Sequence, residues 1–297
     1  MKVYALLEQD MVQEAFELAR QNNFSSSIEC SAAALFYSMF HDELLTEEFA
    51  ERALKTAKGE KEVAYALAAR ASALMVEERM KEAVEVLNRS VETYETQMAR
   101  KMLASCYMHL HDFTKSFENA ERAYALLPSV GNHALVYLSL FNSGRLKEAF
   151  EESEKALKEA EGDDKLIVLG DRVRMLFTLS ERQPEVLPLL RKETTRLILF
   201  PVRSDDWVAL KVRILLSTKQ ANLALEVVEE GRRLFPESWL LKLEHADVLF
   251  SLGEKERALE LALPVIMNEK VPSYFFDDKV LSKELLNFVI SQGLVQT

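Results

Sequence analysis

The chain has 297 residues, 48% of them hydrophobic, and a formal net charge of −11. Such an acidic chain, without a run of lysines or arginines, repels phosphate backbones, so nucleic acid is excluded as an expected partner. Only 8 glycines and 7 prolines occur, which disfavours turn-rich sheets and disordered linkers. Alanine, leucine, glutamate, lysine and arginine dominate and lose little rotamer freedom in a helix, so the composition predicts a nearly all-α protein.

The sequence contains no targeting or membrane signal that we recognise. Residues 1–20 alternate charged and apolar side chains too often for a signal peptide. No apolar run reaches the roughly eighteen residues of a membrane span. Cys30 and Cys106 lie in apolar helical segments, as buried free thiols do in reducing compartments, and a disulfide between them is the less favoured alternative. We therefore expect a soluble, cytoplasmic protein that does not bind membranes.

The pattern of the first 96 residues predicts a single helix followed by two pairs of helices. Residues 2–22 are expected to form one amphipathic helix. Ser26 and Glu29 then have the spacing of a capping box, which predicts that the next helix begins there. Residues 27–58 and 64–96 each predict a pair of helices with small residues at corresponding positions.

The clearest helix pair is predicted over residues 97–129. Its first helix carries Leu103, Ala104 and Tyr107 on one face, and the turn HLHDF follows. The second helix is marked by Phe113, Ser116, Ala120 and Ala123, and Pro128 ends it. Ser116 stands where alanine is usual, which predicts a mild loss of apolar packing.

Further units follow at a fixed period. Residues 130–162, 205–238 and 239–271 repeat the pattern, and Ala149 follows Ser116, as Ala258 follows Ala224, after about 33 to 34 residues. Gly144 suits the left-handed turn between two helices. Residues 165–200 predict two helices, with Pro184 at a helix start, but the small residues are missing and the unit is degenerate.

These marks resemble the tetratricopeptide repeat over residues 27–272. The resemblance implies an all-α α-solenoid, a right-handed superhelix of about seven stacked antiparallel helix pairs. Residues 1–26 are then an N-terminal capping helix, and residues 273–297 a C-terminal one, because terminal repeats need an outer face that water tolerates.

Catalytic signatures are absent from the sequence. It has no glycine-rich phosphate loop, no zinc-protease motif and no nucleophile elbow. The closest histidine cluster, His109 and His111 with Asp112, is interpreted as a solvated turn rather than a metal site, as is His41 in the corresponding earlier turn. We expect no enzymatic activity, no cofactor and no metal.

In tetratricopeptide arrays the first helix of each pair lines the concave wall that binds peptides, so the resemblance places a groove on these helices. Wall residues follow the small packing residue by about one, four and five positions. They combine an adaptable apolar strip with polar side chains that can orient a peptide. The candidate groove residues are Met75, Lys101, Met108, His109, Phe141, Asn142, Arg213, Leu216, Asp247 and Phe250.

The predicted function is a scaffold or adaptor that binds a segment of a partner protein in this groove. One alternative is a peptide-sensing regulatory receptor. Another is a structural subunit or homo-oligomer that associates through its terminal helices, with Tyr274, Phe275 and Phe276 near the contact. For this aromatic cluster, capping of the last repeat is the favoured interpretation. The partner's identity is not encoded in any motif.

Overall fold

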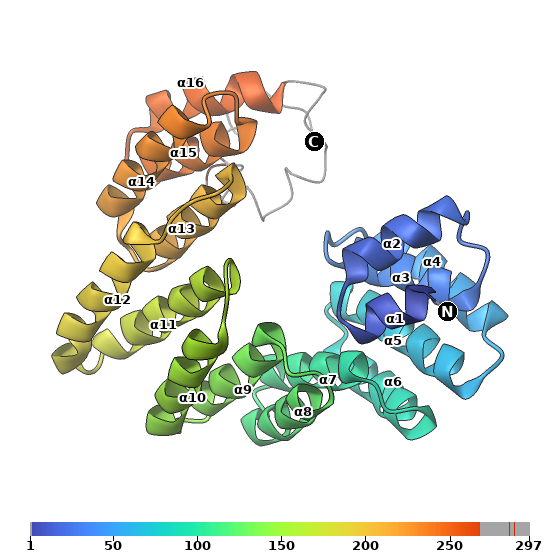
Figure 1. The fold of residues 1–297 in the computed structure, drawn as a ribbon. Coiled ribbons are helices and arrows are strands. Elements are labelled where there is room, and N and C mark those ends of the chain that lie inside the picture. Colours follow the sequence, from blue (N-terminus) through green and yellow to red (C-terminus); the bar gives the residue numbers. More distant parts are fainter. Residues whose placement is uncertain (1, 268–284, 286–287, 289–297) are drawn as a thin grey trace. The chain divides into compact units, whose positions relative to one another are not determined.

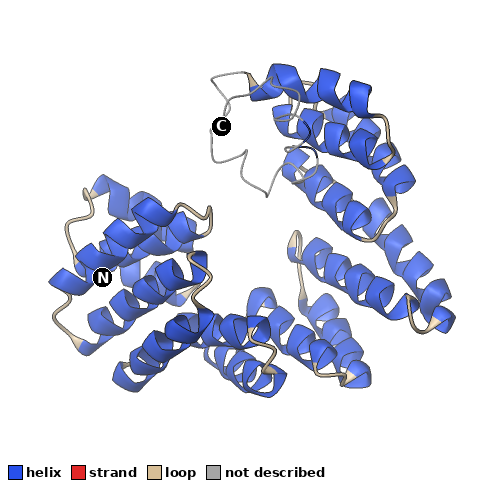
Figure 2. Ribbon diagram, turned by 180° about the vertical axis from the view of Figure 1, so that it is seen from behind, coloured by secondary structure: helices blue, strands red, loops and turns tan. Residues whose placement is uncertain are grey.

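The computed structural model describes residues 2–267, together with Leu285 and Phe288. All regular structure in these residues is helical, as Figure 2 shows. The chain forms two compact units, residues 1–160 and 161–297. Among the described residues, no helix combines the length and the apolar character that crossing a bilayer requires.

The first unit is a series of antiparallel helix pairs in which each pair packs on the next (Figure 1). Its helices are α1 (Lys2–Glu8), α2 (Val12–Gln21), α3 (Ser27–Ser38), α4 (Glu43–Thr56), α5 (Glu60–Val76), α6 (Met80–Thr93), α7 (Gln97–His109), α8 (Phe113–Leu126), α9 (Val130–Asn142) and α10 (Leu146–Glu159).

The second unit repeats the same arrangement. Its described elements are α11 (Asp164–Ser180), the 3₁₀ turn η1 (Pro184–Val186), α12 (Leu187–Leu199), α13 (Asp205–Ser217), α14 (Ala221–Leu234), α15 (Trp239–Ser251) and α16 (Lys255–Ile266). Leu285 and Phe288 are helical and pack against the apolar cluster of this unit. The other residues of the predicted C-terminal cap lie outside the described residues.

The predicted all-α stack of antiparallel helix pairs is confirmed. The capping box is present, since the Glu29 carboxylate accepts a hydrogen bond of 3.0 Å from the backbone N–H of Ser26. Pro184 opens η1, and Gly144 has a φ of 81° in the turn between α9 and α10. Local chemistry therefore placed these three helix ends correctly.

The prediction of one helix over residues 2–22 is wrong. The chain breaks after Glu8, and Asp10 adopts a left-handed φ of 61° without a glycine to permit it. Backbone hydrogen bonds from Asp10 to Leu7 and from Met11 to Leu6, of 3.1 and 2.9 Å, close the turn. The break lets α1 fold back onto α3 and α7, where Leu7 is fully buried. Tertiary burial of α1 outweighs the propensity for one continuous helix.

Small residues stand at the helix crossings of the first unit. Ala83, Ala120 and Ala149 are fully buried. Where serine replaces alanine, its hydroxyl is satisfied by the neighbouring backbone: Ser90 donates to the Ala64 carbonyl at 2.7 Å, and Ser116 to the Ala104 carbonyl at 2.9 Å. The departure at Ser116 is therefore compensated by a buried hydrogen bond.

Cys30 and Cys106 are both buried and both free, as predicted. Burial raises the pKa of the Cys106 thiol to about 12, and burial also raises the pKa of Cys30. Both thiols therefore stay protonated near neutral pH and act as small apolar side chains in the core.

The degenerate unit over residues 165–200 is a true helix pair, α11 and α12, and it does contain a small crossing residue. A Cβ atom on Gly170 would lie 2.5 Å from Cδ1 of Ile214, so α11 and α13 approach closely there. The buried ammonium of Lys211 donates to the carbonyls of Ile198, at 2.8 Å, and of Phe200, at the end of α12. These contacts join the degenerate pair to the following one.

Gly231 lies at a close crossing of α13 and α14, and this predicts its response to substitution. A Cβ atom there would lie 2.4 Å from Cγ1 of the buried Val208. Gly231→Ala should therefore lower the free energy of unfolding by about 1–3 kcal/mol through overpacking. Both tryptophans, Trp207 and Trp239, lie in this unit, so denaturation followed by tryptophan fluorescence reports on it.

The matched control is Gly131→Ala in α9, where nothing lies within 4 Å of the added Cβ atom. It should leave tryptophan-detected unfolding unchanged. A Gly231→Ala chain as stable as the parent would contradict the close crossing of α13 and α14.

Candidate functional site

Helix α1 lies on the face that the first helices of successive pairs, α3, α5 and α7, present in the first unit. We call this the first-helix face. The rings of Tyr4 and Tyr65 meet edge to face at 5.7 Å, and Gln97 Nε2 donates to the Leu7 carbonyl at 3.4 Å. Glu8 forms an ion pair with Lys61. The chain's own N-terminal helix thus covers part of the surface predicted to be the groove.

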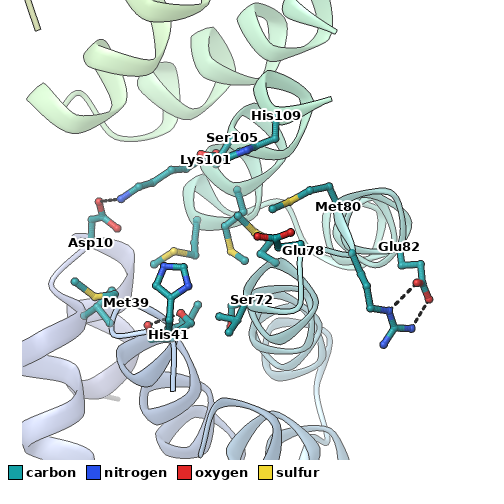
Figure 3. A pocket seen from close by; sticks show the side chains of 18 of the residues that line it. Asp10, Met39, His41, Ser72, Glu78, Met80, Glu82, Lys101, Ser105 and His109 are labelled. Atoms are coloured by element: carbon teal, nitrogen blue, oxygen red, sulfur yellow. Dashed lines mark hydrogen bonds and ion pairs between the residues drawn. The ribbon is translucent and has the colours of Figure 1, made fainter. Parts of the chain in front are cut away.

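A cavity of about 1280 Å³ opens on this face where α1 ends (Figure 3). Its walls come from the turn between α1 and α2, the C-terminal halves of α3 and α5, the start of α6, and α7. Asp10, His41 and Glu78 all lie at its edge, and all three adopt a left-handed φ of between 53° and 61°. The turns of three successive helix pairs therefore converge on one opening.

The apolar part of the cavity is unusually rich in methionine. Five of the ten methionines in the chain line it: Met39, Met75, Met80, Met98 and Met102. Met39 is 53% exposed. Unbranched thioether side chains repack readily around different apolar groups, so such a lining accommodates side chains of more than one shape.

The polar part of the cavity contains internal ion pairs. Lys101 Nζ lies 2.5 Å from Asp10 Oδ2, while Asp10 Oδ1 is buried and lacks a hydrogen-bond partner. The Arg79 guanidinium contacts Glu77 and Glu82, each at 2.6 Å. Figure 3 shows the Lys101–Asp10 pair on one side of the cavity and Glu82 on another.

The structure brings together part of the predicted groove. Met75, Lys101 and His109 line the same cavity, alongside Ser72 and Ser105. His109 is exposed at its edge. The offsets after the small packing residue gave Met75 and His109, and Lys101 was expected one turn earlier on the same face. The three side chains share one cavity, and their role in binding stays a prediction.

The other candidates of the first unit lie on the same helices or the next one but outside the cavity. Met108 is partly buried. Phe141 packs against Phe150, with ring centroids 6.5 Å apart. Asn142 is exposed and donates to the Leu138 carbonyl at 2.8 Å.

The remaining four candidates belong to the second unit. Arg213 Nε donates to Glu244 Oε1 at 2.6 Å, and Asp247 is buried. Leu216 and Phe250 are partly buried against the apolar cluster of this unit. The ring centroids of Phe250 and Phe288 are 5.5 Å apart. The partner-binding role of all ten candidates stays a prediction.

Sequence reasoning missed most of the methionines and the turn after α1. Met39, Met80 and Met98 do not follow a small packing residue at the expected offsets, and Asp10 was assigned to the middle of a helix. One available signal was compositional, because six of the ten methionines fall between residues 39 and 108.

The interpretation of the histidine cluster as a turn is confirmed. His111 has a left-handed φ of 59°, and Asp112 caps α8 by accepting from the Lys115 N–H at 3.2 Å. His41 and Asp42 repeat this geometry at the start of α4. Across the residues that the structure describes, no group of three or more His, Cys, Asp or Glu side chains could hold a metal ion.

Comparisons with known proteins identify the fold and no more. No protein-family model matches the chain, and no curated protein matches it. The apo quorum sensor NprR from B. thuringiensis is 13% identical, with a TM-score of 0.51, covering 89% of this chain and 95% of that one. NprR in complex with its cognate peptide NprX is also 13% identical, with a TM-score of 0.51 and coverage of 98% and 96%.

A third solved structure, the APC/C hetero-tetramer Cut9–Hcn1, is 10% identical with a TM-score of 0.52. The match covers 91% of this chain but 53% of that one, so this chain spans about half of it. The chain has a tetratricopeptide-like fold of helical repeats, as the resemblance implied. At identities this low the likeness shows the fold alone.

The buried Glu244 carboxyl gives the second unit a predictable pH dependence. Burial raises its pKa to about 7, although Arg213 opposes this shift. Because the folded pKa lies above the unfolded value of 4.5, the folded state binds more protons between these values. The contribution of Glu244 to the free energy of unfolding should then be fully present below pH 4.5 and be lost as the pH rises to about 7, by at most about 1.4 kcal/mol per pH unit.

Glu244→Gln should flatten this fall, measured by tryptophan-detected denaturation from pH 5 to pH 8. The exposed Glu226→Gln serves as the control and should keep the parent slope. Equal slopes in Glu244→Gln and the parent would show that Glu244 titrates normally in the folded state.

Proposed function

We propose that this chain is a non-enzymatic protein-interaction adaptor, and that the methionine-lined cavity of its first unit anchors a segment of the partner protein. The observation that carries this proposal is the cavity itself, an apolar hollow with a charged rim on the first-helix face. A helical repeat fold without a catalytic motif displays surfaces rather than reactive groups.

The size of the cavity favours a polypeptide over a small molecule. Typical small-molecule pockets measure about 300–1,000 Å³. At about 1280 Å³, and formed by four successive helix pairs, this one has room for several side chains. Apolar anchors that fill such a pocket contribute most of the affinity at protein interfaces.

The ten groove residues that the sequence predicted are proposed to contact the partner. Met75 supplies apolar contact in the cavity, and Lys101 and His109 supply polar groups at its rim. Met108 on α7 and Phe141 and Asn142 on α9 extend the same surface beyond the cavity. In the second unit, Arg213, Leu216, Asp247 and Phe250 form a separate candidate surface.

A second candidate function is a regulatory receptor for a short peptide. Its support is that the NprR structure, which covers nearly the whole chain, was solved with its cognate peptide NprX. This proposal predicts that a bound peptide compacts the chain, which solution scattering detects, whereas the adaptor proposal predicts unchanged dimensions.

Association through the terminal helices is the third proposal, and the described residues favour it least. Leu285 is fully buried, and Phe288 contacts Phe250 within the same unit. Both side chains therefore serve as a cap for the last helix pair, which leaves less apolar surface for a second copy.

The adaptor proposal predicts that removing cavity methionines weakens partner capture. Met39→Ser combined with Met75→Ser should reduce affinity at least about tenfold, because two apolar contacts are lost from the anchor site. The measurement is affinity capture from the source cells with quantitative mass spectrometry, comparing the parent and variant chains.

Circular dichroism of each variant establishes that it folds. Met267→Ser is the matched control, since Met267 is 70% exposed in the second unit, and it should capture the same proteins as the parent. Capture that is equal for the cavity variant and the control would reject the cavity as the partner site.

A further inference from the structure

We infer that the partner segment is basic and amphipathic: it inserts apolar side chains between the methionines and places a lysine or arginine against Asp10. This inference rests on the proposed function and specifies the chemistry of the occupant. It follows from how charge is distributed and used around the cavity.

The first unit as a whole attracts cations. Residues 1–160 contain 26 acidic and 18 basic residues, hence a formal net charge of −8. A field of this sign raises the association rate of positively charged segments and lowers that of acidic ones.

The cations at the cavity are already engaged. Lys101 is neutralised by Asp10, and Arg79 lies between Glu77 and Glu82. Little positive charge at the rim is therefore left for the carboxylates of a partner, apart from the exposed Lys81.

Within the described residues, two carboxylates at the cavity make no ion pair, unlike the cations of Lys101 and Arg79. Glu14 and Glu78 both line it, and neither makes an ion pair in the part of the chain that the structure describes. The exposed charged groups at the rim that make no ion pair with another described residue are therefore two carboxylates, of Glu14 and Glu78, and one ammonium, of Lys81. An acidic segment would meet repulsion here, whereas a basic one would meet attraction.

A partner cation can complete the hydrogen bonding of Asp10. Its Oδ2 is held by Lys101, but Oδ1 is buried and accepts no hydrogen bond. A buried acceptor without a donor is destabilising, so a donor that reaches Oδ1 once the turn after α1 adjusts around the partner gains more than one that binds an exposed oxygen. A lysine or arginine side chain entering beside the methionines provides that donor together with the opposite charge.

The test uses three short fluorescent peptides of equal length added to the full chain. The first peptide carries leucines on one face of a helix and lysines on the opposite face. The second replaces every lysine by glutamate, and the third replaces every leucine by alanine. By fluorescence anisotropy at physiological salt, the leucine–lysine peptide should bind at least about tenfold more tightly than either of the others.

Variants locate the binding. Asp10→Asn and Glu14→Gln should each weaken binding of the leucine–lysine peptide about three- to tenfold, through loss of one charge-assisted contact. Glu85→Gln is the matched control, because Glu85 is exposed on α6 and does not line the cavity. It should bind like the parent.

Two results would overturn the inference: a leucine–glutamate peptide that binds as tightly as the leucine–lysine one, or equal weakening by Glu85→Gln and Glu14→Gln. If capture of cellular partners still depended on Met39 and Met75, the adaptor function would stand and only the basic chemistry would fail. If capture were also independent of these methionines, both proposals would fail.

Discussion

Close approach of helices at small side chains is the constraint on which the rest of this structure depends. A helix pair cannot bury its apolar face alone, and alanine, serine or glycine at a crossing lets the next pair cover it. Gly231 against Val208 and Gly170 against Ile214 show how little space remains at these crossings. Because the crossings recur at a fixed period, each pair presents its first helix on the same face of its unit.

The candidate site is a consequence of this stacking together with one local break. The turn after Glu8 folds α1 back onto α3 and α7, which covers part of the first-helix face and ends at the cavity. The same turn places Asp10 beside Lys101, so this lysine, which is proposed as a polar group at the rim, is paired with a carboxylate of its own chain. What remains open is an apolar, methionine-lined surface with excess negative charge.

Much of the fold was predictable because its determinants are local. Capping by Ser26 and Glu29, the left-handed Gly144 and the helix start at Pro184 each depend on a few adjacent residues. The site was predictable only in part. Met75, Lys101 and His109 follow from helix periodicity, but Met39 and Met80 enter the cavity from helix ends whose placement depends on three-dimensional packing. The break at Asp10 carries no glycine or proline signal, and it is stabilised by burial of Val3 and Leu7.

The sequence by itself determined that this chain forms helices, where several of them begin and end, and many of the small residues at their crossings, although not Gly170. These features depend on backbone propensity, caps and a period that repeats along the chain. Only the tertiary structure decided which side chains share a cavity, that Lys101 is neutralised by Asp10, and that the Glu244 pKa is raised. The physical reason is that burial and charge pairing depend on groups distant in sequence, and no local pattern encodes their separation in space.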